Sequence, residues 1–186
     1  LERHGAANIV VDPVMVATSG ARLISEDAVE ALRARLLPLA DVVTPNMPEA
    51  EVLCRFAVDD DASMERAARE LAGRVRGAAL VKGGHSFARA DDVLVAHADA
   101  PALWLRAERI ETENTHGTGC TLSSAIASNL AKGFALEEAV ARAKAYLTDA
   151  LNAQLDLGRG SGPLDHTLGG VGVENWMHGV PDAVHK

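Results

Sequence analysis

The chain has 186 residues, of which 48% are hydrophobic and 24% charged, and its mean hydropathy is +0.03. This length and composition favour one globular domain with a sizeable core over a disordered segment. The formal net charge of -8 and the pI near 5.3 argue against nucleic acid as a partner, because nucleic-acid-binding surfaces are usually basic. The sequence shows neither a long apolar run nor a charged-then-apolar leader. We therefore expect no membrane partner and a cytoplasmic protein.

The cysteines and histidines do not form a metal-binding or disulfide pattern. Cys54 and Cys120 lie far apart in the sequence, and the seven histidines are scattered. Paired-ligand spacing would be expected for a structural zinc site, and a denser cysteine framework for a disulfide-rich fold. We therefore expect a reducing compartment and no dedicated transition-metal site.

Three short apolar runs predict the strands of a mostly parallel sheet. They cover residues 9–11, 41–43 and 78–81, and their continuous apolar character is typical of strands that are covered on both faces. Two later segments, 92–97 and 103–110, alternate more clearly between apolar and polar residues. These segments predict an antiparallel hairpin at one edge of the sheet.

Helical patterns separate the predicted strands. Ser25 is a favourable N-cap for a helix whose inner face would carry Ala28, Leu32 and Leu36, and Pro48 suits the first turn of the next helix. Further helices are predicted over residues 63–76, 122–130 and 136–151. This alternation of strands and helices predicts an α/β fold, a three-layer αβα sandwich. In such a sheet, ligands bind beyond the carboxyl ends of the strands.

The stretch from Thr115 to Thr121, with the sequence THGTGCT, combines a glycine turn with the start of a helix. Backbone N–H groups at a helix start lack intrahelical acceptors, and the helix dipole favours a negative charge there, so the turn suits a phosphate. The same field favours thiolate over thiol at Cys120, which makes this side chain a candidate base. Two simpler explanations remain open for this stretch. Cys120 could be a small buried cysteine that only fills space, and the glycine turn could serve only to let the helix pack closely on the strand.

Polar residues also follow the other predicted strands. Asp12, Thr44, Asn46 and Lys82 would all meet at one rim of a parallel sheet. From the residues alone, simpler roles remain open: Asp12 could end its strand in an Asx turn, and Glu49 could stabilise a helix dipole. Lys82 could be a solvated lysine before a turn.

Four stretches of the chain resemble the ribokinase-like kinases, and most closely the hydroxymethylpyrimidine and phosphomethylpyrimidine kinases of thiamine biosynthesis. They are VDPVMVATSG at residues 11–20, TPNMPEAE at 44–51, VKGGH at 81–85 and NTHGTGCT at 114–121. The resemblance implies ATP-dependent phosphorylation of a small pyrimidine alcohol, and then of its monophosphate, on a ribokinase-like sandwich. The cysteine at position 120 restricts the resemblance to fewer subgroups of the ribokinase-like kinases, because many members of that family have an aspartate there.

The resemblance implies a role for each stretch. The backbone N–H groups of Gly117, Thr118, Gly119 and Cys120 would form an anion hole, with Cys120 also accepting the hydroxyl proton. The Asn-x-x-Glu motif is associated with Mg²⁺ and phosphate, so Glu49 and Asp12 are the candidates linked to the metal. The expected nucleotide contacts are Thr44, Asn46, Lys82, Gly83 and Thr115, and the expected walls of the pyrimidine pocket are Val14 and Met15.

The resemblance also sets expectations for the whole protein. Relatives carry a further N-terminal segment, so we expect residues 1–167 to form a kinase domain that lacks it and residues 168–186 to form an irregular tail. ATP and Mg²⁺ are the expected cofactors, and the full-length form is expected to be a homodimer. Two other functions stay open: a pyridoxal or pyridoxine kinase, and a non-catalytic nucleotide-binding fragment.

Overall fold

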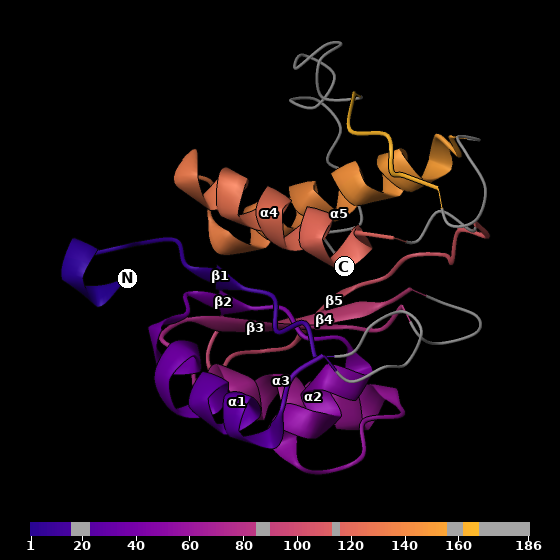
Figure 1. The fold of residues 1–186 in the computed structure, drawn as a ribbon. Coiled ribbons are helices and arrows are strands. Elements are labelled where there is room, and N and C mark those ends of the chain that lie inside the picture. The colour runs from indigo at the N-terminus through magenta and orange to yellow at the C-terminus, as the bar shows by residue number, and fades with distance from the viewer. Residues whose placement is uncertain (16–22, 85–89, 113–115, 156–161, 168–186) are drawn as a thin grey trace.

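A central sheet lies between two helical layers in the computed structural model, which describes residues 1–15, 23–84, 90–112, 116–155 and 162–167 (Figure 1). The five strands follow one another across the sheet in chain order. Their bounds are Val10–Val11 (β1), Val42–Val43 (β2), Ala78–Lys82 (β3), Asp92–Val95 (β4) and Leu103–Leu105 (β5).

Helices cover both faces of this sheet. On one face lie α1 (Glu26–Ala31), α2 (Met47–Cys54) and α3 (Asp61–Ala72), and on the other lie α4 (Thr118–Ala131) and α5 (Leu136–Asn152) (Figure 1). There are also three shorter helical segments among the described residues, η1 (Glu2–His4), η2 (Leu32–Leu36) and η3 (Leu37–Leu39). The predicted three-layer αβα sandwich is therefore confirmed.

The strand pairing agrees with the predicted topology. β1 pairs with β2, and β2 with β3, in parallel, whereas β3 with β4 and β4 with β5 are antiparallel. The edge hairpin is thus confirmed, but its second strand ends at Leu105, and the predicted extension to residue 110 is wrong. The carboxylate of Asp91 explains the early end, because it accepts the backbone N–H of Ala107 at 2.9 Å.

Several helices differ from their predicted bounds or faces: α3 ends at Ala72 instead of residue 76, and α4 spans Thr118–Ala131 instead of 122–130. α3 begins at Asp61, before the predicted residue 63, because the side chain of Asp60 caps it by accepting the backbone N–H of Ser63. Ser25 caps α1 as predicted, but Ala28 is exposed and Val29 is the residue of α1 that is buried. The prediction of Ala28 on the inner face is therefore wrong by one position.

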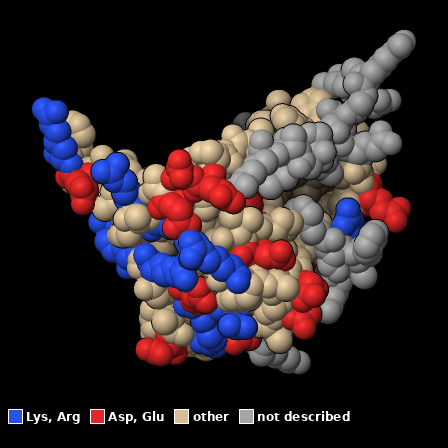
Figure 2. Space-filling view, turned by 60° about the horizontal axis from the view of Figure 1, so that its bottom comes forward, with Lys and Arg blue, Asp and Glu red and all other residues tan. Residues whose placement is uncertain are grey.

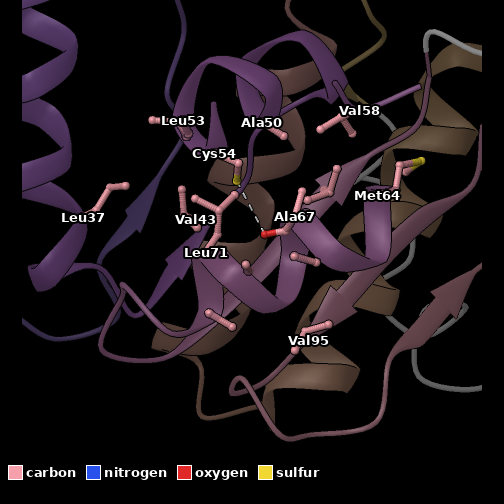
Figure 3. Close-up of a cluster of buried hydrophobic side chains, with 14 of the residues drawn as sticks. Leu37, Val43, Ala50, Leu53, Cys54, Val58, Met64, Ala67, Leu71 and Val95 are labelled. Atoms are coloured by element: carbon pink, nitrogen blue, oxygen red, sulfur yellow. Dashed lines mark hydrogen bonds between the residues drawn. The ribbon is translucent and has the colours of Figure 1, made fainter. Parts of the chain in front are cut away.

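The core consists of two clusters, one on each face of the sheet. Figure 3 shows the cluster between the sheet and α2 and α3, where Val43 and Leu71 lie beside Cys54. Burial raises the pKa of Cys54 to about 12, so this side chain stays a thiol. Leu80 on β3 and Ile126 on α4 belong to the second cluster. Buried side chains on both faces explain the continuous apolar runs of the strands.

The helical layer formed by α1, α2 and α3 carries charges of both signs. Figure 2 shows Lys and Arg side chains among Asp and Glu side chains on this face. Many of these side chains pair: Arg33 and Arg55 both bind Glu30, and Arg69 binds Glu65. Among the described residues, no helix is both long and apolar enough to cross a membrane.

A close backbone contact at Gly77 gives a test of the fold. A Cβ atom at this residue would lie 2.2 Å from the carbonyl oxygen of Asp41, so strand β3 must shift to admit it. We expect Gly77→Ala to lower the free energy of unfolding by about 2 kcal/mol, as overpacking does. Chemical denaturation of this variant, followed by circular dichroism, measures the change.

Gly73→Ala is the matched control. A Cβ atom there would meet its nearest neighbour at 3.5 Å, which is ordinary contact, so we expect the free energy of unfolding to stay within about 0.5 kcal/mol of the parent value. Equal stability of the two variants would contradict the observed approach of Gly77 to Asp41.

Candidate active site

The carboxyl ends of the three parallel strands meet at one rim of the sheet. Asp12 follows β1, Thr44 follows β2, and Lys82 is the last residue of β3. Lys82 Nζ donates to Asp12 Oδ1 at 2.9 Å, and Thr44 Oγ1 donates to the same oxygen at 3.3 Å. The structure therefore brings together three predicted site residues, of which Asp12 and Lys82 are 70 positions apart.

The ion pair at this rim is largely shielded from solvent. The side chains of Lys82 and Asp12 are 14% and 11% exposed, and Thr44 is buried. Coulomb interactions are stronger at such a site than between fully exposed groups, because solvent screens them less. The pair therefore holds the Lys82 ammonium in a defined position.

Helix α4 begins beside this ion pair. Its N-cap is Gly117, with φ of 81°, a left-handed conformation that favours glycine. The first intrahelical bond runs from Thr121 N–H to the Gly117 carbonyl at 2.8 Å. The N–H groups of Gly119 and Cys120 therefore belong to the helix start, where the helix supplies no acceptor. Cys120 is exposed on this first turn, whereas Thr115 lies outside the described residues.

Gly119 is the point of contact between the helix start and the ion pair. A Cβ atom on this residue would lie 3.0 Å from Lys82 Nζ and 3.3 Å from Asp12 Oδ2. Glycine thus lets the ammonium approach the first turn of α4 closely. Two sources of positive potential, the helix start and Lys82, converge here and favour an anion.

Asn46 and Glu49 form a reciprocal cap at the start of α2. Asn46 Oδ1 accepts the Glu49 N–H at 2.9 Å, and Glu49 Oε2 accepts the Asn46 N–H at 2.8 Å. Glu49 is 3% exposed. Burial raises the pKa of its carboxyl group, and the bond from Asn46 and the charge of Lys82 oppose this effect. The structure thus shows a structural role for Glu49, and its link to a metal stays a prediction.

Asn46 is also tied to the third strand. It forms a parallel bridge with Lys82, whose backbone N–H donates to the Pro45 carbonyl at 2.8 Å. The cap of α2 and the end of β3 are therefore one connected piece of backbone. This contact places the Asn46 segment beside Lys82 at the rim of the sheet, where the sequence predicts it.

The remaining predicted residues lie as follows. Gly83 is buried, and its closest approach is to a neighbouring backbone, since a Cβ atom would lie 2.1 Å from the Asp91 carbonyl oxygen. Met15 is buried in the core cluster that contains Val43 and Leu71, whereas Val14 is 45% exposed. The roles of Gly83 in nucleotide binding and of Val14 and Met15 in a pyrimidine pocket stay predictions.

Two residues near the rim were missed by the sequence prediction. Asp92 accepts the backbone N–H of Gly83 at 3.1 Å and pairs with Lys144 from α5. The adjacent acids Asp91 and Asp92 at the start of an apolar strand were a signal for such a contact. The partner on α5 could not be inferred, because it is 52 positions away.

The arrangement suits the binding and transfer of a phosphate group. It offers helix-start N–H donors, one well-placed cation and an exposed thiol. Among the residues that the structure describes, no group of three or more His, Cys, Asp or Glu side chains is arranged to hold a metal. A divalent ion at this rim would therefore take several of its ligands from water and phosphate oxygens, as Mg²⁺ commonly does.

Comparison with known proteins identifies relatives of this chain. A family model described as phosphomethylpyrimidine kinase matches residues 1–165. A hydroxymethylpyrimidine/phosphomethylpyrimidine kinase of Rhizobium meliloti is 52% identical over 169 residues, which are 89% of this chain and 63% of that protein. The corresponding kinase of Haemophilus influenzae is 44% identical over 85% of this chain and 60% of its own length.

Solved structures show the same fold. An ADP complex of Bacillus subtilis pyridoxal kinase superposes with a TM-score of 0.78 at 32% identity, covering 89% of this chain and 61% of that one. A phosphomethylpyrimidine kinase of Clostridium difficile gives a TM-score of 0.68 at 36% identity, covering 81% and 60%. The chain therefore has the ribokinase-like fold, and it spans about three fifths of the length of these proteins.

The two cysteines give a test of the site geometry. Cys120 is exposed at a helix start, whereas Cys54 is buried with its pKa raised to about 12. We expect a thiol reagent to modify Cys120 rapidly at neutral pH and Cys54 only after unfolding. Absorbance of the released chromophore measures both phases.

Cys120→Ser identifies the reactive group. This variant should lose the rapid phase and keep the slow one. A rapid phase that survives the substitution, or two rapid phases in the parent protein, would contradict the observed burial of Cys54 and exposure of Cys120.

Proposed function

The chain belongs to the phosphomethylpyrimidine kinase family, and from this membership we propose that the protein transfers the γ-phosphate of ATP to hydroxymethylpyrimidine and then to its monophosphate. The relatives whose names state these two activities are 40–52% identical to the chain. The observation that carries the proposal is the position of Lys82 Nζ, 3.0 Å from where a Cβ atom of Gly119 would lie, which brings a cation to the first turn of α4. Because the chain covers only part of these relatives, the activity is proposed for the whole gene product.

Neutralisation of phosphate charge is the main task of such a site. The transition state of phosphoryl transfer is loose and anionic, so catalysis depends on positioning and electrostatic stabilisation. In this proposal the N–H groups of residues 117–120 hold the transferring phosphate, and Lys82 stabilises its negative charge. Asn46, Thr44, Gly83 and Thr115 complete the nucleotide site.

Cys120 acts as the general base in this proposal. Its exposed thiol stands on the first turn of α4, next to the backbone N–H groups that would hold the phosphate. The hydroxyl oxygen of the alcohol attacks the γ-phosphorus, the bond from that phosphorus to the bridging oxygen of ADP breaks, and the thiolate takes the hydroxyl proton. For the second phosphorylation the attacking group is a phosphate oxygen of the monophosphate, and a base is needed less.

Asp12 and Glu49 are the proposed links to Mg²⁺. Both carboxylates lie at the rim, and the Asp12 charge acts on Glu49 by raising the pKa of its carboxyl group, after the larger effect of burial. Carboxylate oxygens suit a hard cation that keeps several waters. When bound, Mg²⁺ would neutralise charge on the phosphates of ATP, while Asp12 and Glu49 orient its water ligands.

We also propose a cytoplasmic homodimer that binds ATP and a small pyrimidine alcohol. The cysteine usage of the sequence supports a reducing compartment. Sedimentation of the purified protein tests the dimer, and a single monomeric species across micromolar concentrations would refute it.

A pyridoxal kinase is the second candidate function. It is favoured by the pyridoxal kinase of Bacillus subtilis, whose structure superposes with the TM-score of 0.78 given above. Both reactions phosphorylate a hydroxymethyl group on a heteroaromatic ring, so the phosphate machinery described here serves either.

A substrate comparison separates the two candidates. The whole gene product is incubated with ATP and either hydroxymethylpyrimidine or pyridoxal, and ADP formation is followed. We expect kcat/KM to be higher for hydroxymethylpyrimidine. A preference for pyridoxal would replace the first proposal, and ATP binding without transfer to either alcohol would favour a non-catalytic nucleotide-binding module.

Removal of the Cys120 thiol tests the proposed base. We expect Cys120→Ala to lower kcat for hydroxymethylpyrimidine about 100-fold or more, as loss of a general base does. The dissociation constant for ATP, measured by calorimetry, should change little, because the backbone N–H groups remain.

Ser124→Ala is the control for this test, since Ser124 is exposed on the same helix, four residues further along. It should leave kcat unchanged. If Cys120→Ala also leaves kcat unchanged, Cys120 has no part in proton transfer.

A further inference from the structure

A buried ion pair lies next to the anion site and outside the residues assigned to it. Lys144 of α5 donates to Asp92 Oδ2 and to the Ala90 carbonyl. The side chains of Asp92 and Lys144 are 7% and 15% exposed. Asp92 is the register partner of Lys82 on the neighbouring strand, so the ammonium of Lys144 reaches the end of the sheet where Lys82 lies, from the helical layer that also contains α4.

The other carboxylate oxygen of Asp92 holds the peptide that follows Lys82. Asp92 Oδ1 accepts the Gly83 N–H at 3.1 Å. A Cβ atom on Gly83 would lie 2.1 Å from the Asp91 carbonyl oxygen and 3.0 Å from Met64 Cε. Gly83 is therefore fixed by a charged acceptor and by direct packing against the backbone, and this fixes the direction in which the chain leaves β3.

Stability alone does not explain this pair. A buried ion pair usually adds little to folding compared with apolar side chains of similar size. The neighbouring residues Val140, Ala143 and Leu147 already join α5 to the second core cluster. The pair of Asp92 and Lys144 instead orients the Gly83 peptide. Gly83 directly follows Lys82, whose ammonium lies next to Gly119 at the start of α4.

We propose that Asp92 and Lys144 are positioning residues for the phosphate site, which act by holding the Gly83 peptide and thereby the backbone of Lys82. Neither side chain touches the ligand in this arrangement. The inference rests on the proposed function, because it uses Lys82 as the cation that meets the phosphates of ATP. Loss of the pair should weaken phosphate binding and leave the binding of the nucleoside part unchanged.

Two double variants test the proposal without leaving a buried charge unpaired. Asp92→Leu with Lys144→Met removes both charges and the acceptor of the Gly83 N–H. Asp92→Asn with Lys144→Met also removes both charges but retains an acceptor oxygen. Arg142→Met is the control on the same helix, because Arg142 pairs with Glu138 and stacks on Phe134, away from Gly83.

The readouts are dissociation constants for ATP and for adenosine, measured by calorimetry on the whole gene product, and hydrogen exchange at the Gly83 amide. For the leucine double variant we expect ATP to bind about tenfold more weakly, as loss of one charge-assisted hydrogen bond would cause. Adenosine should bind as it does to the parent protein, and the Gly83 amide should exchange faster. The asparagine double variant should recover most of the ATP affinity, and Arg142→Met should match the parent.

Each remaining outcome decides the matter. Unchanged ATP affinity in the leucine double variant overturns the positioning role, and so does an equal loss of ATP and adenosine affinity, which would indicate a general structural defect. Failure of the asparagine variant to recover ATP affinity also overturns it. A parent protein that binds adenosine but not ATP refutes the use of Lys82, and one that binds neither refutes the proposed function itself.

Discussion

The parallel pairing of β1, β2 and β3 is the constraint on which the site depends. It aligns Val11 with Val43 and Val43 with Ala79, so the residues that follow these strands meet at one rim. Packing on both faces fixes this alignment: Val81 points into one core cluster and Leu80 into the other. A slip of one residue would exchange the two faces of a strand. The position of Lys82 relative to Asp12 is therefore set by the packing of apolar residues on both sides of the sheet.

The ion pair between Lys82 and Asp12 also explains how a cation can be held at the rim before an anion binds. A largely buried ammonium without a partner would be costly, and the Asp12 carboxylate offsets part of that cost. Both side chains contact the space that a Cβ atom of Gly119 would fill. A phosphate at the start of α4 would therefore meet Lys82 already charged and oriented, with little reorganisation when it binds. Thr44, which donates to the same Asp12 oxygen, helps to hold the carboxylate in place.

The sequence predicts those features that depend on local patterns. The continuous apolar runs, the cap at Ser25, the helix start at Pro48 and the glycine turn at residues 117–119 predict the layers of the fold and the rim where the site residues gather. Features set by distant partners were missed. The early end of β5 depends on the Asp91 carboxylate, which accepts an N–H from Ala107. The pairing of Asp92 with Lys144 joins residues 52 positions apart, and no periodicity reports such a contact. The prediction for α1 failed locally, because it placed Ala28 on the inner face where the structure has the next residue, Val29.

The Asn-x-x-Glu motif shows why a sequence pattern and its physical meaning have to be separated. The same spacing is that of a capping box, and the structure contains that box between Asn46 and Glu49. The cap has a consequence beyond helix stability, because Asn46 bridges to Lys82 and so ties the start of α2 to the end of β3. Burial raises the pKa of the Glu49 carboxyl group, and the hydrogen bond from the Asn46 backbone N–H opposes this effect. In the proposed function the cap and the phosphate site share residues, and we expect a change at Glu49 to act on Lys82 through the backbone bridge of Asn46, whether or not Glu49 also meets a metal ion.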